Sequence, residues 1–169
     1  MISLGGALLI IVGIPSMVVM LAFLVGFLRM RADRRLFSSG GQEPPEVPLE
    51  ILVPVKGVFP DQESILASLL KQDYASYGVM FIIEGEQDPA NALIDKLCAQ
   101  FPIARKVISG VSNACGQKNY NLVKGAGELR PETDIIVFCD STNAAQPCWL
   151  RNFTAPLRAG KVEVVTTFR

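Results

Sequence analysis

A run of 25 uncharged residues extends from Leu4 to Leu28 and restricts the folds that this chain can adopt. At about 1.5 Å per residue, a helix of this length would extend roughly 37 Å, enough to cross the hydrocarbon core of a bilayer. Gly13, Pro15 and Gly26 would weaken a soluble helix but are tolerated in membranes. A buried helix of a soluble protein is the alternative, and the length of the run favours a membrane span.

Four arginines follow this run directly, whereas no charged side chain precedes it: Arg29, Arg31, Arg34 and Arg35. Because positively charged flanks remain in the cytoplasm, the pattern predicts a single-pass protein whose carboxyl-terminal part is cytoplasmic. A cleaved signal peptide would need positive charge before the run and small residues at a cleavage site after it, and the sequence has neither. We expect residues 1–30 to form the anchor, residues 31–48 a flexible linker, and residues 49–169 a soluble domain.

Composition excludes several classes of function. The 16 basic and 16 acidic residues balance, but four of the basic ones flank the expected anchor, so the remainder is mildly acidic and nucleic acid is not an expected partner. The chain has no histidine, and its four cysteines lack Cys-x-x-Cys spacing, which argues against zinc sites and against Ser-His-Asp or Cys-His catalysis. We expect reduced thiols, with Cys98 and Cys139 in the core.

From residue 49 onward, short apolar runs alternate with segments of helical periodicity. Strands are expected over residues 49–55, 79–83, 104–108, 134–139 and 162–166. Helices are expected to start near Asp61, Asp88, Lys118 and Pro147. This alternation predicts an α/β fold with a mainly parallel, Rossmann-like sheet, in which the run 134–139 is buried on both faces.

Loops that follow the strands hold the candidate site residues, because open parallel sheets bind ligands at the carboxyl ends of their strands. Lys56 and Gly57 follow the first expected strand, and Asp140 follows the fourth. A carboxylate that leaves a buried strand into a cleft is a natural ligand for a hard divalent cation, which would in turn bind diphosphate oxygens. Asp140 could equally well form a turn, and the pattern does not decide between the two roles.

The remaining candidates have weaker patterns. Glu84 and Glu86 follow the second strand and could be solvated loop charges, while Asp88 is expected to cap the next helix. Residues 116–118 (Gly-Gln-Lys) lie at an expected helix start, where backbone amides and the Lys118 ammonium could hold an anion, although a surface lysine is the simpler interpretation. The preceding loop lacks the Gly-Lys-Ser/Thr of a phosphate-binding P-loop.

Several short motifs, in this order and spacing, resemble the family 2 glycosyltransferases, in particular their ceramide glucosyltransferase-like branch. They are VPVKG (53–57), SLLKQDY (68–74), QDPA (87–90), GQKNYNL (116–122) and FCDS (138–141). The resemblance implies a GT-A fold, a nucleotide-diphosphate sugar as donor, a divalent cation (Mg²⁺ or Mn²⁺) and inversion at the anomeric carbon. With the expected anchor, it also implies a lipid-like acceptor at the cytoplasmic membrane face.

The resemblance also implies roles for individual residues. Asp140 corresponds to the aspartate associated with the metal and the diphosphate. The donor-binding residues would be Pro54, Lys56, Gly57, Glu84, Glu86, Lys118 and Asn121. Two positions depart from the family pattern, because Gly85 and Thr142 stand where many members have aspartate. The family's catalytic-base aspartate and its Gln-x-x-Arg-Trp segment would lie beyond the equivalent of Arg169, so the chain corresponds to the amino-terminal, donor-binding part.

A membrane-tethered nucleotide-binding or interaction module without catalysis is the alternative function. A nicotinamide-binding Rossmann domain is disfavoured, because no Gly-x-Gly-x-x-Gly motif follows the first expected strand.

Overall fold

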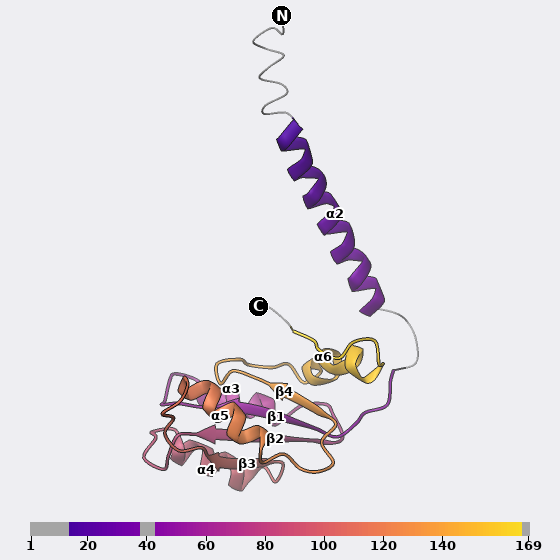
Figure 1. Cartoon of the computed structure of the whole chain (residues 1–169). Helices are drawn as coiled ribbons and strands as arrows, with labels where there is room; N and C mark the ends of the chain where they lie inside the picture. The colour runs from indigo at the N-terminus through magenta and orange to yellow at the C-terminus, as the bar shows by residue number, and fades with distance from the viewer. Residues whose placement is uncertain (1–13, 38–42, 167–169) are drawn as a thin grey trace, which may run out of the picture. The chain divides into compact units, whose positions relative to one another are not determined.

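Four runs rich in Val, Ile and Leu form one parallel sheet in the computed structural model, which describes residues 14–37 and 43–166. The strands are β1 (Leu49–Pro54), β2 (Tyr77–Ile83), β3 (Ala104–Ile108) and β4 (Ile135–Phe138). They lie in the order β3-β2-β1-β4, and every neighbouring pair is parallel (Figure 1). The parallel α/β sheet predicted from the sequence is confirmed.

Helices cover both faces of this sheet. They are α3 (Gln62–Leu69), α4 (Asn91–Gln100), α5 (Gln117–Ala126) and α6 (Trp149–Arg158). Helices α3, α4 and α6 pack on the face that presents Ile51, Val53 and Phe81, and this side holds the main core. Helix α5 packs on the opposite face, where Leu52 and Met80 belong to a smaller core. The two layers result from the alternation of side chains along each strand.

Strand β4 differs from the prediction that it is buried on both faces. It is an edge strand in the described part of the chain. Val137 points into the main core, but Ile136 and Phe138 are 40% and 60% exposed on the other face. The reason is that α5 contacts β1 and β2 and leaves β4 uncovered. An apolar run alone does not show which faces of a strand will be covered.

The prediction of a last strand over residues 162–166 is wrong, because this segment has no regular secondary structure. Helix α6 ends in a turn in which Gly160 has a φ of 63° and the Lys161 N–H donates to the Pro156 carbonyl at 3.1 Å. Val164 is then 82% exposed. Residues with high strand propensity form a strand only where a neighbouring strand offers hydrogen bonds and a surface to pack on.

All four cysteines are present as thiols, as expected. Cys139 is buried, whereas Cys98 is half-buried and packs against the main core. Burial raises the pKa of the Cys98 thiol, with a smaller increase from nearby Asp95 and an opposing effect of Lys106. This thiol therefore behaves as a small core side chain rather than a reactive group.

The amino-terminal unit contains one described helix, α2 (Ile14–Phe37). Residues 4–13 of the predicted membrane span lie outside the described residues, and the helix continues past the predicted end at Leu28. Large apolar side chains between Met17 and Leu28 are exposed along it. Within the described ranges, no helix reaches the combination of length and apolarity needed to cross a bilayer. The membrane span therefore stays a prediction.

The second unit begins at Pro44, whereas we expected the domain to begin at Leu49. The end of the expected linker is attached to the domain by hydrogen bonds. The Tyr74 hydroxyl donates to the Val47 carbonyl at 2.9 Å and accepts from the Val47 N–H at 3.1 Å. Arg158 of α6 donates to the Pro44 carbonyl. These contacts leave less chain for a flexible tether than the composition indicated.

A buried carboxylate on β1 joins three segments of the domain, and sequence reasoning missed it. Glu50 is 1% exposed and accepts from Arg105 Nη2 at 3.0 Å and from Arg130 Nε at 2.8 Å. Its register partner on β2 is Gly78, where an added Cβ would lie 1.9 Å from Arg130 Nη2. The glycine therefore provides the space through which the Arg130 guanidinium reaches Glu50.

We expect Glu50→Gln to lower the free energy of unfolding by about 1–3 kcal/mol, measured by urea denaturation. The amide removes the charge that both guanidinium groups share and places an N–H donor beside donors. Glu63→Gln is the matched control, because its ion pair with Lys96 is about half exposed on both sides and should contribute less than about 1 kcal/mol. Equal effects of the two substitutions would contradict a structural role for Glu50.

Candidate functional site

The direction of the chain across the sheet reverses between β1 and β4. The chain passes from β1 to β2 and β3 on one side, then returns to place β4 on the other side of β1. Open α/β sheets bind ligands at the carboxyl ends of the strands that flank such a reversal. An open cavity of about 290 Å³ lies there, lined by Pro54, Val55, Lys56, Gln117, Lys118, Asn121, Asp140, Ser141 and Thr142.

Among the predicted site residues, this cavity brings together Pro54, Lys56, Lys118, Asn121 and Asp140. They come from segments far apart in the sequence: the end of β1, the first turns of α5 and the loop after β4. The lining supplies two ammonium groups, one carboxylate and two hydroxyl groups. Such a set can bind a doubly charged anion together with a cation.

The two charged groups on the β4 side of the cavity contact each other. Lys118 Nζ lies 2.5 Å from Asp140 Oδ1, and the two side chains are 59% and 53% exposed. An ion pair this exposed adds little to stability. The pair matters for the site because it places the Lys118 ammonium of α5 in contact with the Asp140 carboxylate that follows β4.

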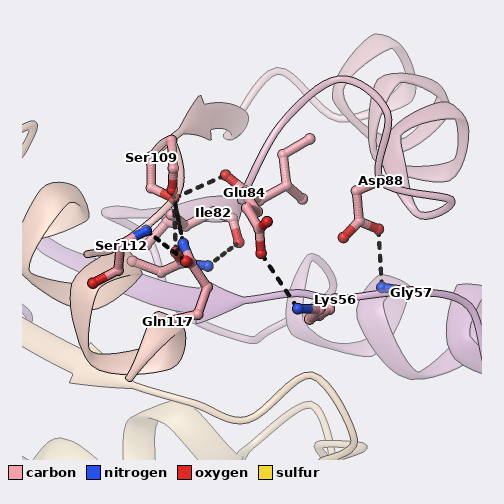
Figure 2. Close-up of polar contacts among 11 residues, drawn as sticks. Lys56, Gly57, Ile82, Glu84, Asp88, Ser109, Ser112 and Gln117 are labelled. Carbon is pink, nitrogen blue, oxygen red and sulfur yellow. Dashed lines mark hydrogen bonds and ion pairs between the residues drawn. The ribbon is translucent and has the colours of Figure 1, made fainter. Parts of the chain in front are cut away.

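A second ion pair lies beside the cavity, between the ends of β1 and β2 (Figure 2). Lys56 Nζ donates to Glu84 Oε2 at 3.3 Å, with Lys56 74% exposed. Glu84 itself does not line the cavity, and its neighbour Glu86 is exposed and also outside the lining. The structure thus connects Glu84 to the candidate site through Lys56, and it does not bring Glu86 into it.

Gly57 and Asp88 form a contact between the loops after β1 and β2 (Figure 2). Gly57 has a φ of 65°, a conformation that favours glycine, and its N–H donates to Asp88 Oδ1 at 2.9 Å. The same oxygen accepts from the Ala90 N–H at 2.9 Å. Asp88 was predicted to cap α4, but Ala90 occupies the N-cap position. The Asp88 carboxylate instead links the loop after β1 to the residues just before α4.

The start of α5 is held in place by a buried side-chain network that sequence reasoning did not identify. Asn121 is 3% exposed, and its Oδ1 accepts from Ser109 Oγ and from Gln117 Nε2, each at 2.7 Å. Its Nδ2 donates to the Ile82 carbonyl at 3.4 Å. Figure 2 shows Ser109, Ile82 and Gln117 converging from three segments. The Asn121 amide is therefore engaged within the protein and positions the turn that carries Lys118.

A sequence signal for this network exists on α5 itself. Asn121 and Gly125, four residues apart, are the buried residues of the helix. An added Cβ at Gly125 would lie 2.4 Å from Ile82 Cδ1, so the helix packs very close to β2. Apolar residues are expected on the helix face that packs against a sheet. An asparagine on that face indicates a buried hydrogen bond, and a glycine indicates a close approach of the helix to the sheet.

The predicted divalent cation has one carboxylate available in this cavity. Within the described ranges, no three acidic, histidine or cysteine side chains gather into a metal site. Mg²⁺ in nucleotide sites commonly takes one or two carboxylates and completes its coordination with phosphate oxygens and water, and carboxylates suit Mn²⁺ as well. Asp140, beside the hydroxyl groups of Ser141 and Thr142, fits a cation held jointly with a diphosphate rather than by the protein alone.

Comparisons with known proteins found a curated relative and a solved structure with a similar fold. The ceramide glucosyltransferase of Komagataella phaffii (strain GS115) is 32% identical over 107 residues, which cover 58% of this chain and 20% of that protein. A mannosyltransferase from Pyrobaculum calidifontis, solved in complex with GDP-Man and Mn²⁺, superposes with a TM-score of 0.56 and 17% sequence identity over 76% of this chain and 38% of that chain. At this identity, the superposition shows a shared fold.

The chain thus spans about a fifth of the curated relative and under half of the solved structure. The family assignment covers much more of it, since residues 14–169 match glycosyl transferase family 21. The predicted resemblance to ceramide glucosyltransferase-like enzymes is confirmed, and the chain belongs to glycosyl transferase family 21.

Proposed function

We propose that this chain is the donor-binding part of a membrane-anchored glycosyltransferase that uses a nucleotide-diphosphate sugar. The observation that carries the proposal is the cavity between β1 and β4, where Lys56, Lys118 and Asp140 meet in a member of glycosyl transferase family 21. The mannosyltransferase that shares the fold was solved with GDP-Man and Mn²⁺, a ligand and a cation of the proposed types.

The charges of the cavity suit a diphosphate. Lys56 and Lys118 both line it, and the amino terminus of α5 adds the partial positive charge of its first backbone N–H groups. Asp140 alone would repel the diphosphate, so its presence makes sense with a cation between the two. We therefore assign Asp140 to an Mg²⁺ or Mn²⁺ ion that also contacts diphosphate oxygens.

The other predicted residues are assigned by where they lie. Pro54 and Lys56 line the cavity and would contact the donor directly. Asn121 positions the turn that presents Lys118. Gly57, Glu84 and Glu86 belong to the loops after β1 and β2, which would frame the nucleotide, with Glu84 orienting the Lys56 ammonium.

The proposed reaction transfers the sugar with inversion. An oxygen of the acceptor hydroxyl forms a bond to the anomeric carbon as the bond from that carbon to the diphosphate oxygen breaks, and the nucleoside diphosphate leaves. The hydroxyl proton passes to a carboxylate base, expected beyond the equivalent of Arg169. The bound cation would offset the negative charge that develops on the diphosphate. The lysines of this chain would hold the diphosphate in place throughout.

A lipid-like acceptor at the cytoplasmic membrane face is the acceptor class that we propose. The support is the identity shared with a ceramide glucosyltransferase together with the uncharged run and its basic flank. An anchor keeps the donor cavity close to the bilayer, which raises the effective concentration of a membrane-bound acceptor.

The topology can be tested with a reporter fused after Arg169. We expect green fluorescent protein to fluoresce and alkaline phosphatase to remain inactive in a bacterial host, because the arginines hold the carboxyl-terminal part in the cytoplasm. Deleting residues 1–30 should release the reporter into the soluble fraction. The reverse reporter pattern, or a full-length fusion that stays soluble, would contradict the anchor.

The cation role of Asp140 can be tested by calorimetric titration of UDP-sugars and GDP-sugars with Mg²⁺ or Mn²⁺ and then with chelator. We expect Asp140→Asn to weaken donor binding about tenfold to a hundredfold, because the amide keeps the size but loses the charge that holds the cation. Asp134→Asn, the same change in an exposed residue just before β4, is the matched control. Equal affinities of both variants, with and without cation, would reject the role.

A nucleotide-binding module without catalysis is the second candidate. One observation favours it: among the described residues that line the cavity, Asp140 is the one carboxylate, and we assign it to the cation, so the lining offers no second carboxylate to act as a base. We expect the 169-residue chain to bind the donor but to transfer radiolabelled sugar to a glycolipid acceptor only when the expected carboxyl-terminal part is supplied. Efficient transfer by the chain alone would rule the module out.

A further inference from the structure

The Lys118 ammonium lies where a cation on Asp140 would bind. Its Nζ is 2.5 Å from Asp140 Oδ1, and both groups line the cavity. A divalent cation approaching the same carboxylate would meet a positive charge already in place, and the two cations would repel each other. In the nucleotide-free protein, the lysine therefore competes with the metal for Asp140.

We propose that the Lys118–Asp140 ion pair makes cation binding depend on the diphosphate. This inference rests on the proposed donor site. Without nucleotide, Lys118 neutralises Asp140 and keeps its affinity for Mg²⁺ or Mn²⁺ low. When a diphosphate enters, its oxygens attract the ammonium, and Asp140 becomes available to a cation that the diphosphate also binds. The cation and the nucleotide then bind cooperatively, because each removes an obstacle to the other.

The structure allows this exchange without movement of the backbone. Lys118 has a flexible four-carbon stem and is 59% exposed, so its side chain can rotate from Asp140 toward the cavity. The turn that carries it is fixed by the buried contacts of Asn121 with Ser109 and Gln117. The switch is therefore one side chain on a rigid support.

The exposure of the pair limits the size of the effect. Exposed ion pairs of this kind change a binding equilibrium by factors of up to about five. We expect Lys118→Met to raise the affinity of the nucleotide-free protein for Mn²⁺ about two- to fivefold. The same substitution should reduce the factor by which UDP or GDP strengthens Mn²⁺ binding, since Asp140 is already available.

The experiment is a titration of the full chain with Mn²⁺, followed by electron paramagnetic resonance of the unbound ion, first alone and then with saturating UDP or GDP. Lys124→Met is the matched control, because it removes the same charge from α5 while its ammonium lies over the Tyr120 ring and away from Asp140. Lys118→Arg keeps the charge beside Asp140 and should leave the nucleotide-free Mn²⁺ affinity as low as that of the wild type.

A gain in nucleotide-free Mn²⁺ affinity in Lys118→Met, absent in Lys124→Met and Lys118→Arg, supports the proposal. Equal Mn²⁺ affinity in Lys118→Met and wild type, including no binding by either, overturns it. The nucleotide-free titration reports on the ion pair independently of donor recognition. A third outcome separates the two proposals. If Lys118→Met raises the Mn²⁺ affinity but the protein binds neither UDP nor GDP, Lys118 does compete with the cation for Asp140, and the proposed donor function is wrong.

Discussion

Close packing of α5 against β2 is the constraint on which the candidate site depends. Gly125 allows the helix to approach within contact of Ile82, and Asn121 replaces an apolar contact with hydrogen bonds to the Ile82 carbonyl and to Ser109. The helix therefore begins close to the carboxyl end of β2 and presents Lys118 to the cavity. A larger residue at 125 would need the helix or the Ile82 side chain to move, and the Lys118 ammonium would shift with the helix.

Charged groups serve two separate purposes in this domain. The buried Glu50 carboxylate, shared by Arg105 and Arg130, joins segments of the fold and cannot exchange partners without leaving buried charge unpaired. Pairs at the cavity are exposed, so Lys118 and Lys56 can leave their carboxylates at small free-energy cost. Stability and ligand exchange therefore rely on different ion pairs at different places on the sheet.

The bounds of the short apolar strands were predicted well, because they depend on the local residue pattern. The strand at 104–108 was predicted with its observed bounds, and the first strand differs from β1 by one residue. The predictions fail where the environment is decided by distant segments. Ile136 and Phe138 are exposed because α5 covers other strands, and residues 162–166 form no strand because none pairs with them. Propensity does not contain this information.

The α/β class, the family motifs and the residues at the carboxyl ends of the strands could all be predicted from the sequence, because they depend on local pattern and on short motifs. The sequence could not determine which of those residues meet. Lys56 and Asp140 share a cavity because β4 pairs with β1, a contact between segments about 85 residues apart. Glu86 lies outside this cavity. The Lys118–Asp140 ion pair is likewise a result of tertiary structure, since only the return of the chain across the sheet brings α5 and the end of β4 together.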